Sequence, residues 1–539
     1  MSTKEETNDS PVISTIISSE NHRPSKTPFN LRFWGIFFAL CLLAFISALD
    51  VAIVTTALPR ITADIGSVEQ EYVWIANSFV VASCVIQPLV GQLADIFGRR
   101  TPLIVATALF ALGSGVAGGS NSVDMMIAGR TVQGVGAGAI YVLLDIVCCD
   151  LVSLRERGKY VGLMNAWAGV AAAIGPVIGG ALADANWRWI FYMNIPICGV
   201  ALAVILLFMR VKTGTVRPGM SKLEQVDWLG NLIFIPSMVS LLLGLVMGGI
   251  QHPWSSWHII LPRALGLTGW IAFHFQQSAS ITRWPSVPAR LFANRTSSTA
   301  YVLTFLASLL VQSAAYFLPV WFQAVLGTTV LQSGVKFLPF AIGTLFFAVV
   351  GGVSLSKFGA YRPLHAAAFA LSAIGFGLFT ILTTSTARWA VFQLIASAGL
   401  GITQSTLLPA IMAGLPEADV AASAAVYSFI RTFGFVWGVT MPSIIFNAIV
   451  NKNLDLISSD ALRDQLRNGA AYSFASHVHG VRNELESERW NEIIMVYTKG
   501  LNVIWWVALG ISIAALVGVA GEKDLELRNE LETEYGIDN

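Results

Sequence analysis

The sequence predicts an all-α integral membrane protein, and three observations support this fold class. Of the 539 residues, 55% are hydrophobic and only 12% are charged, whereas soluble domains carry about 25% charged residues. The apolar residues gather into runs of about 20, the length that a helix needs to cross a hydrocarbon core of about 30 Å. The basic residues fall mainly in alternate loops between these runs. We therefore predict about fourteen transmembrane helices.

The apolar runs fall into three groups along the chain. Six runs lie near residues 33–57, 72–93, 102–120, 124–149, 160–183 and 189–209. Two more lie near residues 227–250 and 258–275. The last six lie near residues 299–323, 334–355, 363–383, 388–412, 424–449 and 499–520. This order predicts two six-helix bundles with two extra helices between them.

These groups suggest a division of the chain into domains. We expect an N-terminal bundle over 33–210, two linker helices with flanking loops over 211–290, and a C-terminal bundle over 291–521. The stretch 451–497 is too polar to span a membrane and is predicted to be a long non-cytoplasmic loop. The polar residues 1–32 lack the apolar core of a signal peptide and are predicted to be a disordered cytoplasmic tail. Residues 522–539 form a second, acidic tail, for which a short helix is one reading.

The distribution of basic residues predicts the orientation of the chain. One set of alternate loops holds Arg99, Arg100, Arg155, Arg157, Lys159, Arg210, Lys212, Arg217, Lys222, Arg283, Arg290, Arg295, Lys357 and Arg362. The opposite short loops hold little beyond Arg60, Arg188 and Arg388. Because basic loops stay on the cytoplasmic side, we expect both termini to be cytoplasmic. The plasma membrane is the expected location, with the vacuolar membrane as the alternative.

Composition and motifs argue against several other classes of protein. The net charge of +1 gives no sign of a nucleic-acid partner. All five cysteines lie inside apolar runs without the spacing of a metal site, so we expect small buried side chains and no metal. The sequence has no phosphate-binding GxxxxGK[ST] loop and no visible pair of nucleophile and base. We therefore expect neither a cofactor nor an enzymatic activity.

A short stretch of sequence occurs twice. Residues 91–102 (GQLADIFGRRTP) join the second and third runs, and residues 352–363 (GVSLSKFGAYRP) join the tenth and eleventh. Glycine, phenylalanine, glycine and proline match at equal spacing, and both stretches lie on the predicted cytoplasmic side. The repeat predicts two parallel halves, a plan that transporters use to hold a substrate between the halves near the middle of the membrane.

Two charged residues lie inside predicted spans of the first half. Asp50 ends the first run in LDVAIVTTALPRI, and Arg130 opens RTVQGVGAG in the fourth. A charge at the centre of a bilayer costs at least about 2.5–3.5 kcal/mol, so each must face a cavity, bind a proton or find a partner. Asp50 could instead cap a kinked helix end near Pro59, and Arg130 could bond backbone carbonyls. The glycines after Arg130 let another helix, or Asp50 itself, approach closely.

The fifth run holds a glycine-rich motif, residues 169–180 (GVAAAIGPVIGG). Its small residues create a groove for a neighbouring helix, and Pro176 bends the helix. In combination, these motifs resemble the major facilitator superfamily. More narrowly, residues 33–520 resemble the fourteen-span drug:proton antiporters that are common among fungal toxin and multidrug efflux pumps.

This resemblance implies a role for each motif. Asp50 and Arg130 would form the proton-coupling pair. The residues of the first repeat would form a conformational latch, in which Asp95 meets a helix N-terminus or an arginine of the other half; the latch residues are Gly91, Asp95, Gly98, Arg99 and Arg100. A second, symmetrical latch is doubtful, because Ser356 stands where Asp95 stands in the first copy. The antiporter motif would consist of Gly169, Gly175, Pro176, Gly179 and Gly180.

Polar and aromatic residues inside the spans are candidates for the substrate cavity. The candidates are Asn77, Gln87, Asp145, Asn165, Trp167, Gln312, Tyr316, Gln404, Tyr427 and Arg431. Asp145 lies fifteen residues after Arg130, which places it on the same face about 22 Å nearer the cytoplasmic end of the helix. It could attract a cationic substrate, relay protons, or pair with a basic loop. Arg431 is a second intramembrane arginine that could serve the latch, the substrate or the structure.

The sequence therefore predicts a proton-coupled secondary transporter that exports small amphipathic compounds, such as drugs, toxins or secondary metabolites, by alternating access. Its expected partners are the small-molecule substrate, protons and the lipid bilayer, with no nucleic acid, and the expected oligomeric state is a monomer. A vacuolar transporter of basic amino acids or a siderophore transporter is the alternative among transporters. From another class, a non-transporting membrane receptor would retain the same fold.

Overall fold

The computed structural model describes residues 30–65, 72–209, 221–249, 251–279, 282–475, 480 and 487–529. In these ranges the secondary structure is helical, apart from one isolated bridge between Gly248 and His252. The expectation for residues 1–32 therefore lies almost wholly outside the described residues.

The long helices follow the predicted order of six, two and six spans. The first group, here called the N-half, consists of α1 (Leu31–Asp64), α2 (Tyr72–Val85), α3 (Gln87–Phe97), α4 (Arg100–Gly118), α5 (Val123–Leu151), α6 (Leu154–Asn186), α7 (Arg188–Tyr192) and α8 (Asn194–Phe208). The linker pair consists of α9 (Trp228–Met247) and α10 (Trp257–Ser278). The last group, the C-half, consists of α11 (Arg295–Ala324), α12 (Val330–Phe358), α13 (Tyr361–Phe379), α14 (Thr386–Met412), α15 (Val420–Lys452), α16 (Asp460–Leu466), α17 (Ala470–Phe474) and α19 (Ser487–Gly518).

The lengths and compositions of these helices suit a membrane. Among the described residues, 11 helices are long and apolar enough to cross one, or up to 13 if each bent pair is one span. The bent pairs are the two helices α2 and α3, which meet at 46°, and the two parts of α6, which meet at 42°. The eighth predicted span, α10, is a helix of 22 residues that packs along α9 but is less apolar than the other spans. Its polar residues Gln276 and Gln277 bond to Asp227 at the start of α9.

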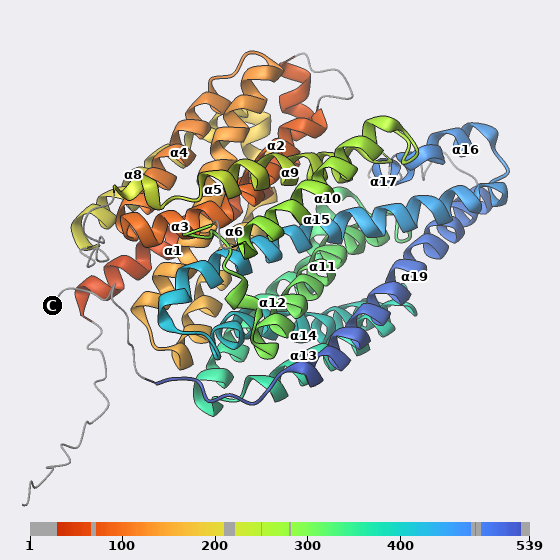
Figure 1. Cartoon of the computed structure of the whole chain (residues 1–539). Helices are drawn as coiled ribbons and strands as arrows, with labels where there is room; N and C mark the ends of the chain where they lie inside the picture. The colour runs from red at the N-terminus through yellow and green to blue at the C-terminus, as the bar shows by residue number, and fades with distance from the viewer. Residues whose placement is uncertain are drawn as a thin grey trace, which may run out of the picture.

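The helices lie roughly along one direction, so the bundle has two ends (Figure 1). We call the end where α1 begins and residues 522–529 lie the termini face, and the opposite end the far face. The short helices α16 and α17, which fall within the predicted loop 451–497, lie at the far face. That loop is shorter than predicted, because α19 begins at Ser487 and continues through the polar residues before the apolar run. Which face is cytoplasmic stays a prediction.

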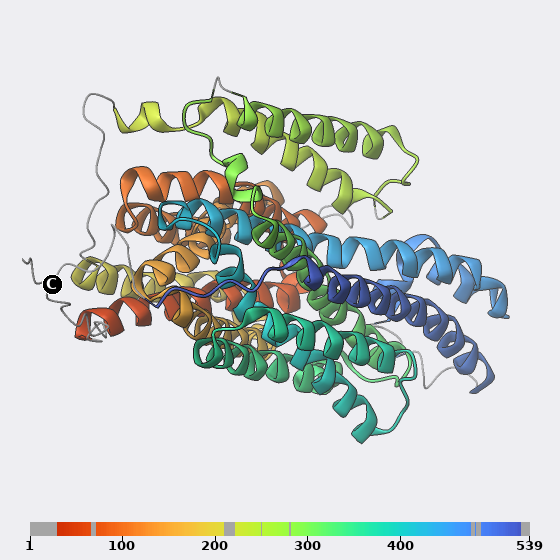
Figure 2. The same ribbon diagram turned by 60° about the horizontal axis from the view of Figure 1, so that its bottom comes forward.

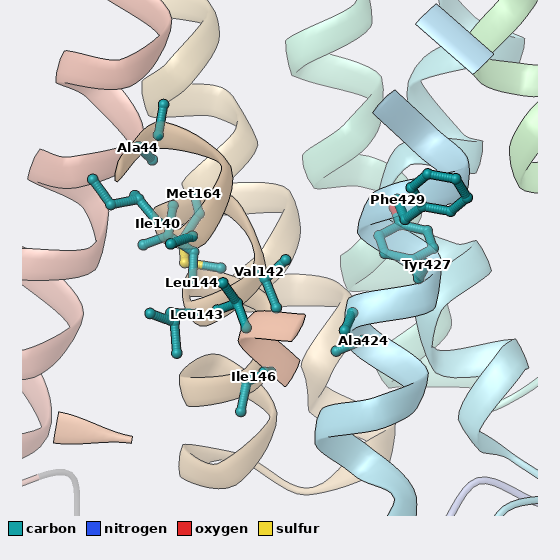
Figure 3. Close-up of a cluster of buried hydrophobic side chains, with 14 of the residues drawn as sticks. Ala44, Ile140, Val142, Leu143, Leu144, Ile146, Met164, Ala424, Tyr427 and Phe429 are labelled. Carbon is teal, nitrogen blue, oxygen red and sulfur yellow. The ribbon is translucent and has the colours of Figure 1, made fainter. Parts of the chain in front are cut away.

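The two halves pack against each other through equivalent helices. The second span of the C-half, α12, packs against the fifth span of the N-half, α6, while α3 packs against the fifth span of the C-half, α15. Figure 3 shows α5 and α15 facing each other, with Val142 on one helix and Ala424 on the other. These residues belong to one continuous apolar core that joins both halves. The predicted repeat thus corresponds to swapped contacts between the halves.

The linker pair lies along one side of the bundle (Figure 2). Phe234 of α9 packs edge-on against Phe429 of α15, and Trp270 of α10 against Phe433 of the same helix. The side-chain amide of Gln92 in α3 donates to the carbonyl oxygen of Trp284 and accepts from the backbone of Asp227. The pair is therefore tied to both halves. The predicted division of the chain near residues 210 and 290 stays a prediction, since residues 210–220 are not described.

Residues 522–529, here called the C-terminal strap, run in an extended conformation along the termini face rather than forming a short helix. Both carboxylate oxygens of Glu522 lie 2.9 Å from Nδ1 of His365 in α13, and both residues are buried. Further along, the backbone oxygen of Arg528 accepts a hydrogen bond from the backbone of Arg155 in the N-half. The strap thus starts on the C-half and ends against the N-half.

Candidate functional site

The structure brings Asp50 and Arg130 together in the interior of the N-half. Nη1 of Arg130 lies 2.6 Å from Oδ2 of Asp50, and the side chains of both residues are almost fully buried. Asp50 comes from the middle of α1 and Arg130 from the second turn of α5. Of the alternatives that the sequence left open, the structure has the direct ion pair between the two residues.

Neutral side chains complete the surroundings of this pair. Gln133, one turn after Arg130, accepts from Nη1 of Arg130 at 2.7 Å and donates to Oδ1 of Asp50 at 2.7 Å. Nδ2 of Asn194, at the start of α8, donates to the same oxygen at 2.9 Å. The amides of Gln133 and Asn194 also donate to the hydroxyl of Ser114 on α4. We call Asp50, Ser114, Arg130, Gln133 and Asn194 the buried polar cluster.

Arg130 has two further contacts outside this cluster. Its Nε donates to the backbone oxygen of Ile75 at 3.2 Å, and its guanidinium carbon lies 4.3 Å from the ring centroid of Phe79. The second alternative from the sequence, a backbone carbonyl as partner, is therefore present together with the carboxylate. Both ionised groups are extensively hydrogen-bonded, as a buried charge requires.

The sequence reasoning missed Ser114 and Asn194 as members of this cluster. A signal was present, because amides and hydroxyls within apolar spans must find hydrogen-bond partners. The partners could not be inferred, because they lie on other helices.

The first copy of the repeat forms a tight connection between α3 and α4. Gly98 has φ of 80°, a left-handed conformation that favours glycine. A Cβ added to Gly91 would lie 2.4 Å from Cβ of Ala425, so this glycine allows α3 to approach α15 closely. Arg100 donates to the backbone oxygen of Leu206 at the end of α8. Gly98 therefore makes the turn between the helices, and Gly91 the close approach of α3 to α15.

The charged residues of this repeat bond within the N-half. Arg99 lies 2.8 Å from Asp95 and 2.7 Å from Asp150, which ends α5, and its side chain is buried. The expected partner of Asp95 was a helix N-terminus or an arginine of the other half. Asp95 forms an ion pair with Arg99 of its own segment, since the buried guanidinium needs carboxylates nearby; the latch to the other half stays a prediction.

Two further ion pairs lie at the termini face, and the first of them joins the two halves. Nη2 of Arg157, a fully buried residue of α6, donates to both carboxylate oxygens of Glu417 at 3.2 and 3.0 Å. Arg290, which precedes the C-half, lies 2.7 Å from Asp419 at the start of α15. The sequence reasoning used Arg157 and Arg290 only as markers of orientation. The acidic residues of 417–419, in a loop on a predominantly basic face, were the signal that it did not use.

The second copy of the repeat also lies at a junction between the halves. Gly359 has φ of 72°, matching Gly98, and a Cβ added to Gly352 would lie 2.2 Å from the backbone oxygen of Gly158 in α6. Arg155 donates to the backbone oxygens of Ser356 and Lys357 at the end of α12. Where the first copy has Asp95, the second therefore uses its backbone to accept bonds from an arginine of the other half.

The glycines of the α6 motif lie in three different environments. A Cβ added to Gly169 would meet Leu345 of α12 at 1.9 Å, and one added to Gly175 would meet Ala52 of α1 at 2.5 Å. Around Gly180 a Cβ would find no atom within 4 Å, while Gly179 is buried. Pro176 stands at the 42° bend of the helix. The motif thus lets α6 pack closely on α1 and α12 near its middle.

Asp145 and Arg431 form a second buried ion pair, and this one spans the halves. Oδ2 of Asp145 on α5 accepts a hydrogen bond of 2.9 Å from Ser428 on α15 and lies 3.7 Å from Nη2 of Arg431. The guanidinium carbon of Arg431 lies 5.2 Å from the ring centroid of Tyr427. The sequence suggested a basic loop as one partner for Asp145, whereas the partner is an arginine within a helix.

Three of the cavity candidates line one small pocket. Gln404, Tyr427 and Arg431 line it together with Thr304, Ala307, Ser308, Thr403 and Leu407. All eight residues belong to α11, α14 and α15 of the C-half. We call this pocket the C-half pocket.

The other cavity candidates lie apart from it. Gln87 is buried and donates to Thr432, which makes it a contact between α3 and α15. Asn165 and Trp167 lie on α6, where Trp167 is 48% exposed. Tyr316 is stacked near Tyr472 at the far face. Asn77 and Gln312 are partly exposed on α2 and α11.

Comparison with known proteins gives the same family throughout. The family model described as Major Facilitator Superfamily matches residues 40–439. The chain is 43% identical to the MFS efflux transporter aclA of Aspergillus oryzae, over 96% of this chain and 94% of that protein. It is 42% identical to the MFS-type efflux pump LUC4 of a Fusarium species, over 99% and 95% of the two chains. The efflux pump FUS6 of Gibberella moniliformis is also 42% identical, over 96% and 92%.

Solved structures agree on the fold. The human organic anion transporter MFSD10 (TETRAN) aligns with a TM-score of 0.57 at 15% identity, over 90% of this chain and 99% of that chain. The proton:xylose symporter XylE aligns with a TM-score of 0.53 at 15% identity, over 83% and 94%. The family match covers most of the chain, the relatives are similar over nearly their full length, and the helices suit a membrane. This multi-pass membrane protein belongs to the major facilitator superfamily.

Proposed function

We propose that this chain exports small amphipathic organic compounds in exchange for protons, by alternating access between its two halves. The observation that carries the proposal is the Asp50–Arg130 pair, a carboxylate and a guanidinium 2.6 Å apart in the interior of the N-half. Its relatives among fungal efflux pumps support the direction of transport. The activity proposed is movement across a membrane rather than a chemical reaction.

The buried polar cluster provides a physical means of coupling. A carboxylate buried beside a guanidinium is stabilised by that charge, and protonation of Asp50 would remove the charge and weaken the pair. Arg130 would keep its bonds to Gln133 and to the backbone oxygen of Ile75, so its charge would remain partly compensated. The proton therefore changes the strength with which α1 is held to α5. Such a change can bias the two conformations of the transporter.

Alternating access is supported by the uneven packing of the halves. The inter-half contacts described above, Arg157–Glu417, Gly352–Gly158 and Gly91–Ala425, all gather toward the termini face. Along α6 the contacts with α12 extend to Gly169, whereas the space around Gly180 is open. If the termini are cytoplasmic, as the basic loops predict, this is an outward-facing conformation that has closed on the cytoplasmic side.

The alternative functions receive less support from the charges. A transporter of basic amino acids needs carboxylates to bind a cation, but Asp50 and Asp145 both face arginines. A receptor without transport would have no use for an ion pair buried inside the N-half. We propose further that the protein acts as a monomer in the plasma membrane, with the vacuolar membrane as the alternative.

The proposal can be tested in cells. The full chain is expressed in a strain that lacks its main efflux pumps, and retention of a broad panel of dyes and toxins is measured with and without an uncoupler. We expect retention of some compounds to fall on expression and to recover with the uncoupler. Asp50→Asn should abolish this difference at equal surface expression. Unchanged retention of every compound would contradict the proposal.

A further inference from the structure

The two buried arginine–aspartate pairs are built differently. In the first, Arg130 approaches Asp50 to 2.6 Å, and two amides complete the carboxylate. In the second, Arg431 stays 3.7 Å from Asp145, beyond normal hydrogen-bond distance. The nearer oxygen of Asp145 is already bonded to Ser428. The second guanidinium is thus held more loosely by its carboxylate, although both sit inside the bundle.

Arg431 also lines a pocket. The C-half pocket contains one cation, Arg431, and no carboxylate among its lining residues. The side-chain amide of Gln404 adds two N–H donors beside the five of the guanidinium. Tyr427, Ala307 and Leu407 add an aromatic ring and apolar surface. Planar N–H donors next to apolar walls suit a carboxylate or a similar anion attached to an apolar body.

The closed pocket is too small for a ligand. Pockets for drug-sized molecules usually measure about 300–1,000 Å³, whereas this one holds only about 10 Å³ in the closed arrangement, the space of a single water molecule. A charged head group can therefore enter only while the halves are apart. An exported compound would bind here through its polar end.

The two members of the pair belong to different halves. Asp145 lies on α5 of the N-half, whereas Arg431 and every residue of the C-half pocket lie on the C-half. When the halves separate at the termini face, Asp145 moves away with the N-half, and Arg431 stays with the pocket. When they close, the carboxylate of Asp145 returns to within 3.7 Å of the guanidinium.

We propose that Arg431 binds an anionic group of the exported compound, such as a carboxylate or an ionised enol, and that Asp145 displaces this group when the termini face closes. This inference rests on the proposed export function and specifies its substrate class as amphipathic organic anions. Arg431 takes up the anion while the termini face is open. Closure brings a competing carboxylate to the same guanidinium, so the anion is released toward the far face.

The test uses pairs of compounds that differ only in charge. Thermal unfolding of the purified full chain is measured with pyrenebutyric, naphthylacetic and decanoic acids, and with the primary amide of each. We expect the acids to raise the unfolding temperature more than the amides. Arg431→Gln should weaken binding of the acids by about tenfold or more, the value of one charge-assisted hydrogen bond, while leaving the amides unchanged. Arg388→Gln, at an exposed arginine of α14, serves as the matched control.

Asp145→Asn separates displacement from a structural role. Without the competing charge, the acids should bind this variant more tightly than the wild type, while their export should slow. A purely structural contact between the halves would predict no tighter binding of acids relative to amides. Equal stabilisation by acids and amides, no stabilisation by either, or unchanged acid binding in Arg431→Gln would each overturn the inference.

Efflux of the same compounds distinguishes this inference from the proposed function. If neutral or cationic compounds are exported with uncoupler sensitivity while acids neither bind nor leave the cell, the substrate class is wrong and the export function stands. If acids bind in an Arg431-dependent way but no compound is exported, the binding site stands and the export function fails.

Discussion

Gly352→Ala should weaken the closed state of the termini face. The added Cβ would lie 2.2 Å from the backbone oxygen of Gly158 and 2.8 Å from the backbone nitrogen of Lys159, whereas ordinary contacts begin at about 3.4 Å. Backbone atoms cannot rotate aside, so α6 and α12 must separate by about 1 Å. Overpacking of this kind costs about 1–3 kcal/mol. The clash is relieved when the halves separate, and so the closed population should fall about 5- to 150-fold relative to the open one.

A matched substitution controls for the change in helix propensity. Gly334→Ala lies on the same helix, α12, where an added Cβ would meet no atom within 4 Å. Both substitutions gain about 1 kcal/mol of helix propensity, but only one introduces the clash. We therefore expect Gly334→Ala to keep the wild-type balance of conformations.

Distances between spin labels report this balance. Thr101→Cys on α4 and Arg362→Cys on α13 place labels on exposed residues of the two halves at the termini face. The five native cysteines are buried, so the labels should attach mainly at the introduced positions. Gly352→Ala should shift the distance distribution toward longer separations. If its distribution matches those of the wild type and of Gly334→Ala, the packing of α12 against α6 does not control closure, and the reasoning is refuted.

Two further substitutions and one truncation test other parts of the account. Glu417→Gln keeps the shape of the side chain but removes the charge facing Arg157. The same label pair should show the closed population falling about tenfold, because charged and neutral hydrogen bonds differ by ~1.4 kcal/mol. An unchanged distance distribution would mean that the Arg157–Glu417 pair contributes nothing to closure. Removal of residues 522–539 eliminates the C-terminal strap and should lower the closed population about fivefold, since a lost hydrogen bond costs ~1 kcal/mol. Identical distance distributions with and without the strap would rule out its part in closure. Asn194→Ala removes a hydrogen-bond donor to the carboxylate of Asp50, so the pH–rate profile of export should shift to higher pH. A profile that does not move would exclude a role for Asn194 in the proton affinity of Asp50.

The pattern of helices could be read from the sequence because apolar length and basic loops act locally. Runs of about 20 apolar residues become helices wherever they lie in a membrane. The bends of the helices were only partly visible: Pro176 marks the bend of α6, and Pro88 follows the break between α2 and α3. The start of α19 at Ser487 was missed, because a helix can extend beyond the membrane through residues that are too polar to span it.

The Asp50–Arg130 pairing was also within reach, because two opposite charges in apolar spans have few other ways to be compensated. The partners of Glu417 and Asp419 could not be predicted, because an acidic residue in a loop usually faces water. Their partners, Arg157 and Arg290, lie 260 and 129 positions away in the sequence. The same holds for Arg431, whose pairing with Asp145 depends on how the two halves pack. Contacts between halves need the assembled fold, and local patterns do not contain it.

The most direct test of the account is proton coupling through Asp50. The purified chain is reconstituted into liposomes loaded with an exported fluorescent compound, and a pH gradient is imposed. We predict that the gradient drives transport by the wild type, and that Asp50→Asn loses this response while still exchanging labelled for unlabelled compound across the membrane. Gradient-driven transport by Asp50→Asn at the wild-type rate would contradict the account, because the carboxylate beside Arg130 would then not carry the coupling proton.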